Sequence, residues 1–329
     1  MKIDPIITRF LQTVSCTPSR IERTSADWGN RSYLRLWEGD TSKILMICKT
    51  EDTGADLEDF VGIDQWIRSI GLNAPELYHI DHEKGLILLE DYGDEYCEDY
   101  TLLSDCIHAL QQAPAPTNLQ QFLDSPVYIA HRRVIDWFVP CRLGKKNDPD
   151  HVEQYLTIWK NIESTLPTPQ TAFAHMDFHP ANFMNVIQED GLKRCGILDF
   201  QDACIGPIAY DYTNLLKDIR KDVPQKIIDQ ILEKATQGMS SEDTQNFMAW
   251  YKFLCVQFHF RIAGQVIKLS LVNGRDDLMV YLPRVMRYIQ EELNDPMFTE
   301  LKEFFDALNL DWNAEDLMIK NELIAPNAY

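Results

Sequence analysis

The sequence predicts an α+β fold with two lobes, a small β-rich lobe over residues 1–93 and a larger helical lobe over residues 94–329. The first observation is that short apolar runs bounded by turn residues fill the first lobe. The second is that apolar residues recur at steps of three and four through most of the second. The third is the length of 329 residues, which exceeds one average domain and suits two lobes with a cleft between them.

The β-rich lobe is expected to hold five strands and one helix. The expected strands are Ile21–Thr24, Ser32–Glu38, Lys43–Thr50, Leu77–Asp81 and Leu86–Glu90. Between the third and fourth strands, Phe60, Ile63 and Ile67 recur at helical steps within Leu57–Ile70, and Gly71 ends that helix. The last two strands are expected to form a hairpin.

The helical lobe is interrupted once by a predicted strand, Arg194–Asp199, with loops on both sides. The expected helices are Leu102–Gln112, Val127–Val139, Asp150–Ser164, Pro224–Thr236, Ser241–Val272, Asp277–Leu293 and Phe298–Leu308. The longest of them is expected to be broken somewhere along its length, and Ser240 supplies N-cap chemistry for its first turn.

Composition excludes several classes of protein. The formal net charge of −20 argues against nucleic acid as a partner, because phosphate binding needs clustered Lys and Arg. No apolar run approaches the roughly 18 residues of a membrane span, and the first residues do not open a signal peptide, so no membrane partner is expected. The eight cysteines form no C-x-x-C pair, which favours reduced, buried thiols and a cytoplasmic location.

Two short motifs carry the chemistry. They read His175-Met-Asp177-Phe-His179-Pro-Ala-Asn182 and Leu198-Asp199-Phe-Gln-Asp202. In phosphoryl transfer one carboxylate orients and deprotonates the attacking hydroxyl, while an amide oxygen and a second carboxylate hold Mg²⁺ against the ATP phosphates. The pattern therefore predicts a kinase in which Asp177 is the general base and Asn182 and Asp199 bind the metal.

These motifs resemble the catalytic core of the aminoglycoside phosphotransferase-like kinases, a branch of the protein-kinase-like fold. Further stretches are similar to bacterial anomeric N-acetylmuramate/N-acetylglucosamine kinases of cell-wall recycling: Leu198-Asp-Phe-Gln-Asp-Ala-x-x-Gly-Pro-x-x-Tyr-Asp211, Arg261-x-x-Gly264, and Tyr281-Leu-Pro-Arg284-Val with Tyr288. The resemblance implies ATP, Mg²⁺ and a small-molecule sugar acceptor, with transfer of the γ-phosphoryl group to an amino-sugar hydroxyl, the anomeric one above all. An aminoglycoside or choline-type phosphotransferase and a non-catalytic nucleotide-binding sensor are the alternatives.

The resemblance also suggests roles for the residues around the predicted base. It places His179 close to the reaction centre and makes His175 a brace for the loop. A neutral histidine hydrogen-bonded to the backbone is the alternative for both, and it is the preferred interpretation for His175. Asp202 lies near the metal and substrate or caps the next turn, and these interpretations are equally compatible with the sequence. Asp211 is expected to support the catalytic loop through hydrogen bonds.

The nucleotide lobe offers a candidate ion pair. Lys49, at the end of a predicted strand, is placed like the lysine that holds the ATP phosphates in kinases. Glu58 is the expected partner, although Asp56 and Asp59 compete for that role. The alternative is a surface lysine in a solvated turn.

Two further segments are expected to contact ATP. Asn30, Arg31 and Ser32 belong to a turn whose backbone amides and side chains could contact phosphate, or which could be an ordinary hairpin turn. Glu90 and Asp91 mark the hinge between the lobes, where the backbone would hydrogen-bond adenine.

The helix that contains Arg261 supplies the one clue to the acceptor. Gln257, Arg261, Gln265 and Lys268 fall on one face of this helix, and the surrounding residues are largely apolar. This polar stripe of four residues either lines a cleft or faces solvent, and the sequence leaves both possibilities open. In a cleft, its cations would suit an anionic or hydroxyl-rich sugar better than a polycationic aminoglycoside. Arg132 and Arg133, or Arg142 with Lys145 and Lys146, could add to the same cleft. The stretch Ala130-His-Arg-Arg133 stands where the resembled sugar kinases are usually acidic.

Overall fold

The structure is a computed structural model that describes residues 4–24, 31–48, 55–313 and 315–329. Contacts group the chain into two compact units, the first formed by Met1–Thr117 with His179–Ala203, and the second by Asn118–Phe178 with Cys204–Tyr329. The predicted division at residue 93 concerns lobes rather than contact units and stays a prediction. Each unit is described by itself.

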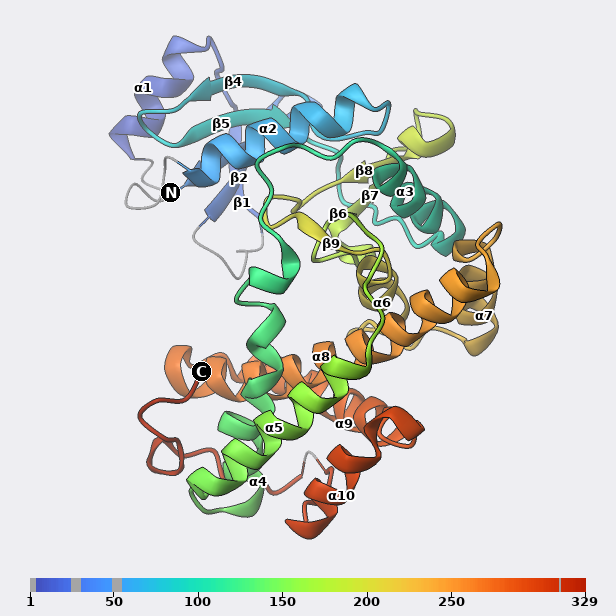
Figure 1. Ribbon diagram of the computed structural model, residues 1–329. Coiled ribbons are helices and arrows are strands. Elements are labelled where there is room, and N and C mark those ends of the chain that lie inside the picture. The colour runs from blue at the N-terminus through green and yellow to red at the C-terminus, as the bar shows by residue number, and fades with distance from the viewer. Residues whose placement is uncertain (1–3, 25–30, 49–54, 314) are drawn as a thin grey trace. The chain divides into compact units, whose positions relative to one another are not determined.

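The first unit is built on a five-stranded antiparallel sheet with the strand order β1-β2-β3-β5-β4 (Figure 1). Its strands are β1 (Arg20–Arg23), β2 (Arg31–Glu38), β3 (Thr41–Cys48), β4 (Leu77–Asp81) and β5 (Leu86–Glu90). The β2–β3 hairpin pairs in register from Arg31 opposite Cys48 to Glu38 opposite Thr41. All five predicted strands are confirmed.

Three helices belong to this unit: α1 (Pro5–Thr13), α2 (Ala55–Ser69) and α3 (Tyr100–Gln112). The sequence analysis predicts α2 and α3 but not α1. Phe10 and Leu11 of α1 pack into the core formed by Leu34, Leu45 and neighbouring strand residues. The Asp4 side chain caps α1 by accepting a hydrogen bond from the Ile6 amide at 2.7 Å.

A second hairpin in this unit joins β7 (Phe183–Asn185) to β8 (Cys195–Ile197), with Phe183 opposite Ile197. The predicted strand Arg194–Asp199 is therefore shorter than expected. Beyond its end, the Leu198 amide still donates to the carbonyl of Asn182 at 3.0 Å. A 3₁₀ turn, Pro180–Asn182, precedes β7.

The second unit is mainly helical. Its helices are α4 (Val139–Leu143), α5 (Pro149–Thr165), α6 (Tyr210–Leu216), α7 (Gln225–Ala235), α8 (Ser241–Asn273), α9 (Leu282–Glu292) and α10 (Thr299–Ala307). A two-stranded antiparallel pair, β6 (Thr171–Ala174) and β9 (Cys204–Pro207), completes it. Short 3₁₀ helices lie at Phe122–Asp124, Tyr128–Arg132, Gly191–Arg194 (in the first unit), Asp276–Tyr281, Pro296–Phe298 and Asn321–Leu323.

The longest helix, α8, runs without a break over 33 residues, so the expected interruption is wrong (Figure 1). The Ser240 hydroxyl caps its first turn by accepting from the Asp243 amide at 3.1 Å, and Gly274, with φ +66°, ends it. Gly264 does not break the helix, because it serves packing: a Cβ at this position would lie 2.0 Å from the carbonyl oxygen of Arg133. The backbone of Arg133 therefore lies directly against α8.

Two predicted helices differ in detail from the structure. The segment predicted as Val127–Val139 consists of the 3₁₀ turn Tyr128–Arg132 and a π-helical turn, Val134–Phe138, before α4 begins. The segment predicted as Asp277–Leu293 starts as a 3₁₀ helix and becomes α-helical at Leu282. The next residue, Pro283, lacks a donor amide and is favoured only in the first turn of an α-helix.

Two observations bear on the expectations from composition. All eight cysteines are buried, free thiols. Over the described residues, no helix combines the length and apolarity that a bilayer span requires.

Candidate active site

A cavity of about 430 Å³ lies within the first unit, a size typical of small-molecule sites. Its apolar wall comes from the sheet, from α2 and from the β7–β8 hairpin, and includes Ile44, Phe60, Leu89, Met184 and Leu198. Asn182 and Asp199 also line it. The cavity thus joins apolar surface to the two predicted metal ligands, which suits a ligand with a flat ring and a charged tail.

The two predicted metal ligands face each other in this unit. The side-chain nitrogen of Asn182, Nδ2, lies 3.5 Å from Asp199 Oδ2. Asp199 Oδ1 accepts a hydrogen bond from Gln201 Nε2 at 2.6 Å. Asp199 has φ +57°, a left-handed conformation that turns the chain immediately after β8. One carboxylate and one amide oxygen are hard ligands, and Mg²⁺ usually takes only one or two protein carboxylates besides phosphate oxygens and water. The pair therefore fits Mg²⁺ held together with a nucleotide.

The residue after Asp199 fixes the loop. Phe200 is fully buried and stacks on Phe60 of α2, with ring centres 4.9 Å apart. The guanidinium of Arg31 lies over the other ring of this pair, 5.6 Å from the centre of Phe60. The stack ties the metal loop to α2, so that Asp199 has a defined position relative to the cavity.

Of the residues predicted to contact phosphate, Asn30 and Lys49 lie outside the described residues. Arg31 is half-buried and Ser32 is exposed at the start of β2. Glu58 is exposed on α2. Its pairing with Lys49 stays a prediction.

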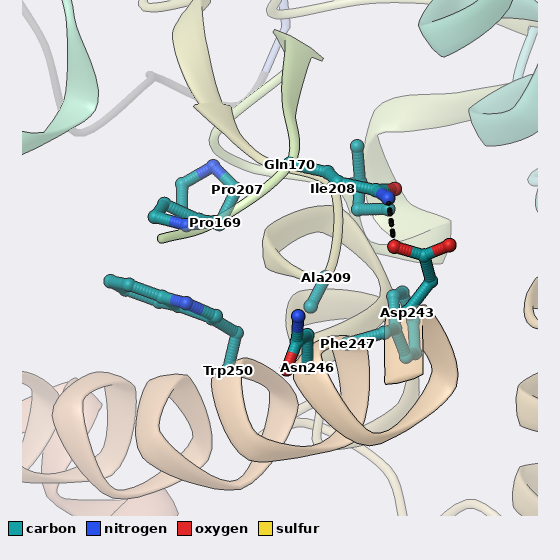
Figure 2. A pocket seen from close by; sticks show the side chains of 9 residues that line it. All are labelled: Pro169, Gln170, Pro207, Ile208, Ala209, Asp243, Asn246, Phe247 and Trp250. Atoms are coloured by element: carbon teal, nitrogen blue, oxygen red, sulfur yellow. Dashed lines mark hydrogen bonds between the residues drawn. The ribbon is translucent and has the colours of Figure 1, made fainter. Parts of the chain in front are cut away.

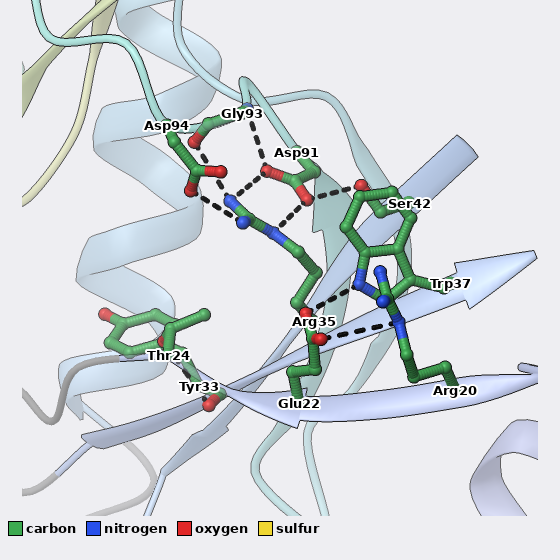
Figure 3. Close-up of polar contacts among 10 residues, drawn as sticks. All are labelled: Arg20, Glu22, Thr24, Tyr33, Arg35, Trp37, Ser42, Asp91, Gly93 and Asp94. Carbon is green, nitrogen blue, oxygen red and sulfur yellow. Dashed lines mark hydrogen bonds and ion pairs between the residues drawn. The ribbon is translucent and has the colours of Figure 1, made fainter. Parts of the chain in front are cut away.

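Both predicted hinge residues, Glu90 and Asp91, line the cavity. The Asp91 carboxylate is not solvated: its side chain is 3% exposed, forms an ion pair with Arg35 Nε at 2.6 Å and accepts a hydrogen bond from the Ser42 hydroxyl at 2.6 Å (Figure 3). Asp91 Oδ1 also accepts from the Gly93 amide at 2.9 Å. Arg35 donates in addition to Asp94 Oδ1 at 2.6 Å and to the Gly93 carbonyl at 2.9 Å. One arginine from β2 thus holds the whole hinge turn.

Nothing in the sequence singles out Arg35. It occupies a polar position in an alternating strand, which normally indicates a solvent-facing side chain. Glu90, by contrast, is held by the backbone, since its amide donates to the Glu76 carbonyl at 2.9 Å and its carboxylate accepts from the Glu76 amide at 3.0 Å.

The predicted base, Asp177, belongs to a loop of the second unit. Asp211 in α6 accepts hydrogen bonds from the backbone amides of His175 at 2.8 Å and Met176 at 3.1 Å. His175 Nδ1 accepts from the Asp177 amide at 3.4 Å, and Met176 has φ +77°. Burial raises the pKa of Asp211 to about 7, although the two amides act in the opposite direction. The hydrogen bonds predicted from Asp211 to this loop are present, and His175 is hydrogen-bonded to the backbone, as its preferred interpretation expects.

His179 and Asp202 belong to the first unit. His179 is buried, and its Nε2 lies 3.3 Å from the side-chain nitrogen of Asn182. It therefore touches a predicted metal ligand. Asp202 is exposed and is not among the residues that line the cavity.

The polar stripe of α8 divides into two parts. Gln257 is fully buried and donates to the carbonyls of Val127 at 2.6 Å and Tyr128 at 3.1 Å, so it joins α8 to the neighbouring 3₁₀ turn. Arg261, Gln265 and Lys268 remain partly accessible. These three are the candidates for acceptor contacts.

A second hollow in this unit is too small for a substrate. It holds about 10 Å³, enough for one water molecule, between α8 and the loop that leads into α6 (Figure 2). Trp250 faces Pro169 and Pro207 there, and Gln170 bonds to Asp243 at 2.8 Å. This hollow therefore belongs to the packing of α8 against that loop.

Comparisons with known proteins agree with this geometry. Residues 20–245 match the phosphotransferase enzyme family. The chain is 26% identical to an N-acetylmuramate/N-acetylglucosamine kinase from Caulobacter vibrioides over 90% of its own length and 94% of that protein, and 26% identical to one from Pseudomonas putida over 86% and 87%.

Among solved structures, the GDP complex of aminoglycoside 2′-phosphotransferase-IIIa has a TM-score of 0.60 at 16% identity, covering 94% of this chain and all of that one. This likeness confirms the predicted kinase-like fold. Because the family match spans most of the chain, including both motifs that carry the predicted base and metal ligands, the chain belongs to the phosphotransferase enzyme family.

Proposed function

We propose that this protein transfers the γ-phosphoryl group of ATP to the anomeric hydroxyl of N-acetylmuramate or N-acetylglucosamine. The observation that carries the proposal is the approach of Asn182 and Asp199 to 3.5 Å beside a cavity of about 430 Å³. The substrate class rests on the curated relatives, which are named N-acetylmuramate/N-acetylglucosamine kinases and match this chain over most of its length.

In the proposed complex the adenine ring occupies the apolar part of the cavity and bonds to the backbone at Glu90 and Asp91. The phosphates extend toward Asn182 and Asp199, which would hold Mg²⁺. A metal ion held by these two residues would neutralise negative charge that develops during transfer. Lys49 with Glu58, and the turn residues Asn30, Arg31 and Ser32, are the proposed additional phosphate contacts.

Asp177 is the proposed base. The sugar oxygen forms a bond to the γ-phosphorus while the bond from that phosphorus to the β–γ bridging oxygen breaks, and the hydroxyl proton passes to the Asp177 carboxylate. Asp211 holds two backbone amides of the loop that carries Asp177. His179, beside Asn182, is the proposed second catalytic residue, and positioning accounts for much of the rate.

On the acceptor side, Arg261, Gln265, Lys268 and Asp202 are the proposed sugar contacts. Two cations among them favour an anionic or hydroxyl-rich sugar and disfavour a polycationic antibiotic. We infer that the protein acts in the cytoplasm in peptidoglycan recycling, as its resemblance to the sugar kinases implies.

The decisive experiment is an acceptor panel with N-acetylmuramate, N-acetylglucosamine, an aminoglycoside and choline in a coupled ADP-release assay. Phosphorus NMR of the product should show an anomeric phosphate on an amino sugar. Turnover of the antibiotic or choline alone would support the alternative phosphotransferases. Binding of ATP without turnover of any acceptor would support a nucleotide sensor.

Asp199→Ala tests the metal assignment. A metal ligand supplies several kcal/mol of transition-state stabilisation, and each 1.36 kcal/mol is tenfold in rate, so kcat should fall at least about 100-fold. Asp190→Ala removes an exposed carboxylate from the same segment and should leave kcat unchanged. Near-normal turnover of Asp199→Ala with Mg²⁺ and ATP would show that this carboxylate does not hold the metal.

A further inference from the structure

Three cationic side chains converge in the second unit where α8 meets the preceding 3₁₀ and π turns. Arg261 and Lys268 lie on α8, about one turn before and one turn after Gly264. The backbone of Arg133 lies against Gly264, since a Cβ there would be 2.0 Å from the Arg133 carbonyl oxygen. Because Gly264 has no side chain, the backbone of Arg133 can approach α8 between Arg261 and Lys268.

The charges of these three side chains affect their pKa values. Burial lowers the pKa of Arg133, and the charge of Arg261 lowers it further. Burial also lowers the pKa of Lys268, with Arg133 as the next cause, while Asp136 acts in the opposite direction. Like charges that lie close together in a partly buried place raise the free energy of the protein. A bound anion would lower it again.

Among the described residues, Tyr329 acts on Arg133 in the favourable direction, since it raises the pKa of that arginine, but it forms no ion pair with it. Arg133, Arg261 and Lys268 form no ion pair within that part of the chain, and the buried Nε atoms of both arginines have no hydrogen-bond partner in it. Asp136, the nearby carboxylate, is already engaged by Arg132 Nε at 2.8 Å and by the Tyr329 amide at 2.9 Å.

Aromatic rings hold the cations in place without neutralising them. The Arg133 guanidinium lies 5.2 Å from the centre of the Tyr329 ring, and Lys268 Nζ lies 5.5 Å from that of Trp137. Both rings are themselves fixed: Trp137 Nε1 donates to the Tyr329 carbonyl at 2.7 Å, and the Tyr329 hydroxyl donates to the Pro126 carbonyl at 2.6 Å. The donors are thus held in position before a ligand arrives.

We propose that Arg133, Arg261 and Lys268 form a carboxylate subsite for the acceptor, and that Arg133 determines the preference for an acidic amino sugar over a neutral one. The inference rests on the proposed function and deepens it. An arginine fork pairs with a carboxylate through two parallel hydrogen bonds, which a neutral sugar cannot offer. N-acetylmuramate carries a carboxylate on its lactyl ether, and N-acetylglucosamine has a hydroxyl at that position.

This substrate pair makes the test specific. The wild type should show a higher kcat/KM for N-acetylmuramate than for N-acetylglucosamine. Arg133→Gln should lower kcat/KM for N-acetylmuramate about tenfold to a hundredfold, the loss expected for a charge-assisted hydrogen bond, and change that for N-acetylglucosamine less than twofold. Arg133→Lys should recover part of the loss. Added NaCl should raise KM for the acidic sugar alone.

Lys268→Gln should give a smaller loss of the same kind. Lys252→Gln, on the same helix but paired with Asp295 at 2.7 Å, should leave the ratio of the two sugars unchanged. Equal kcat/KM for the two sugars in the wild type, or an unchanged ratio in folded Arg133→Gln, would overturn the subsite. If circular dichroism shows that Arg133→Gln is unfolded, the ratio in Lys268→Gln decides in its place.

Calorimetric binding of each sugar without nucleotide separates this inference from the proposed function. If neither sugar is phosphorylated, the proposed function fails. The subsite then still stands if N-acetylmuramate binds more tightly than N-acetylglucosamine and Arg133→Gln removes the difference. It falls if N-acetylmuramate does not bind.

Discussion

Replacing Arg35 by alanine should destabilise the first unit far more than its place on a strand suggests. The substitution removes an ion-pair contact at 2.6 Å and a hydrogen bond at 3.0 Å from the Asp91 carboxylate, whose side chain is only 3% exposed. The bond to Asp94 contributes little, because that carboxylate is 85% exposed. Most of the effect comes from leaving Asp91 charged, buried and without its guanidinium.

The magnitude follows from this burial. Removing one partner of a buried ion pair costs about 3–5 kcal/mol. The Ser42 hydroxyl and the Gly93 amide still donate to Asp91, at 2.6 Å and 2.9 Å, so we expect the lower end, about 3 kcal/mol of unfolding free energy.

Urea unfolding followed by circular dichroism, with an unchanged m-value, measures this loss. Arg275→Ala is the matched control, since Arg275 also binds one carboxylate through two nitrogens, at 2.8 Å and 2.9 Å from Asp277, but on the surface. It should lose far less. Adding Asp91→Asn to Arg35→Ala should restore part of the stability, because the unpaired charge disappears. A loss in Arg35→Ala no larger than in Arg275→Ala would refute the reasoning.

Two further substitutions test the second unit. The pKa of Asp211 is about 7 in the folded protein, and that of an unfolded aspartate is near 3.9. Between these values the folded protein holds more protons at Asp211 than the unfolded protein does. The contribution of Asp211 to stability therefore falls as pH rises. From pH 5 to pH 8 the wild type should lose about 2–3 kcal/mol relative to Asp211→Asn, and parallel urea midpoints of the two proteins would contradict this. Gly264→Ala should cost about 1–3 kcal/mol through its clash with Arg133, measured as a lower melting temperature. Gly62→Ala in α2, where no atom lies within 4 Å of the added Cβ, should instead raise stability by up to about 1 kcal/mol.

Elements with strong local signals were predictable. The five strands of the first sheet follow from short apolar runs bounded by turn residues. The helix α1 could have been found as well, since Asp4 and Pro5 form a capping signal, and Phe10 and Leu11 follow at helical spacing from Ile6 and Ile7. This helix was missed because the prediction began with the first strand and did not consider the residues before it.

Other features depend on tertiary packing that a local pattern does not contain. A glycine inside a helical run indicates a possible break, but Gly264 permits α8 to touch the Arg133 backbone, and the helix continues. The switch from 3₁₀ to π turns at the same place has no local signature either. Arg35 looks solvent-facing until β2 is paired with β3, which brings Ser42 close enough to share Asp91 with it.

The same contrast explains why the reaction class was readable from the sequence while the acceptor was not. Metal ligands and base must lie within a few ångströms of one phosphate, so short loops carry them, and Asp177, Asn182 and Asp199 appear close together in the sequence. The proposed acceptor contacts come instead from segments that are distant in the sequence. Arg133 and Lys268 become neighbours only because Gly264 lets their segments approach. Their charges favour a carboxylate only when considered together, so acceptor specificity has to be sought in packed pairs of segments and not in motifs.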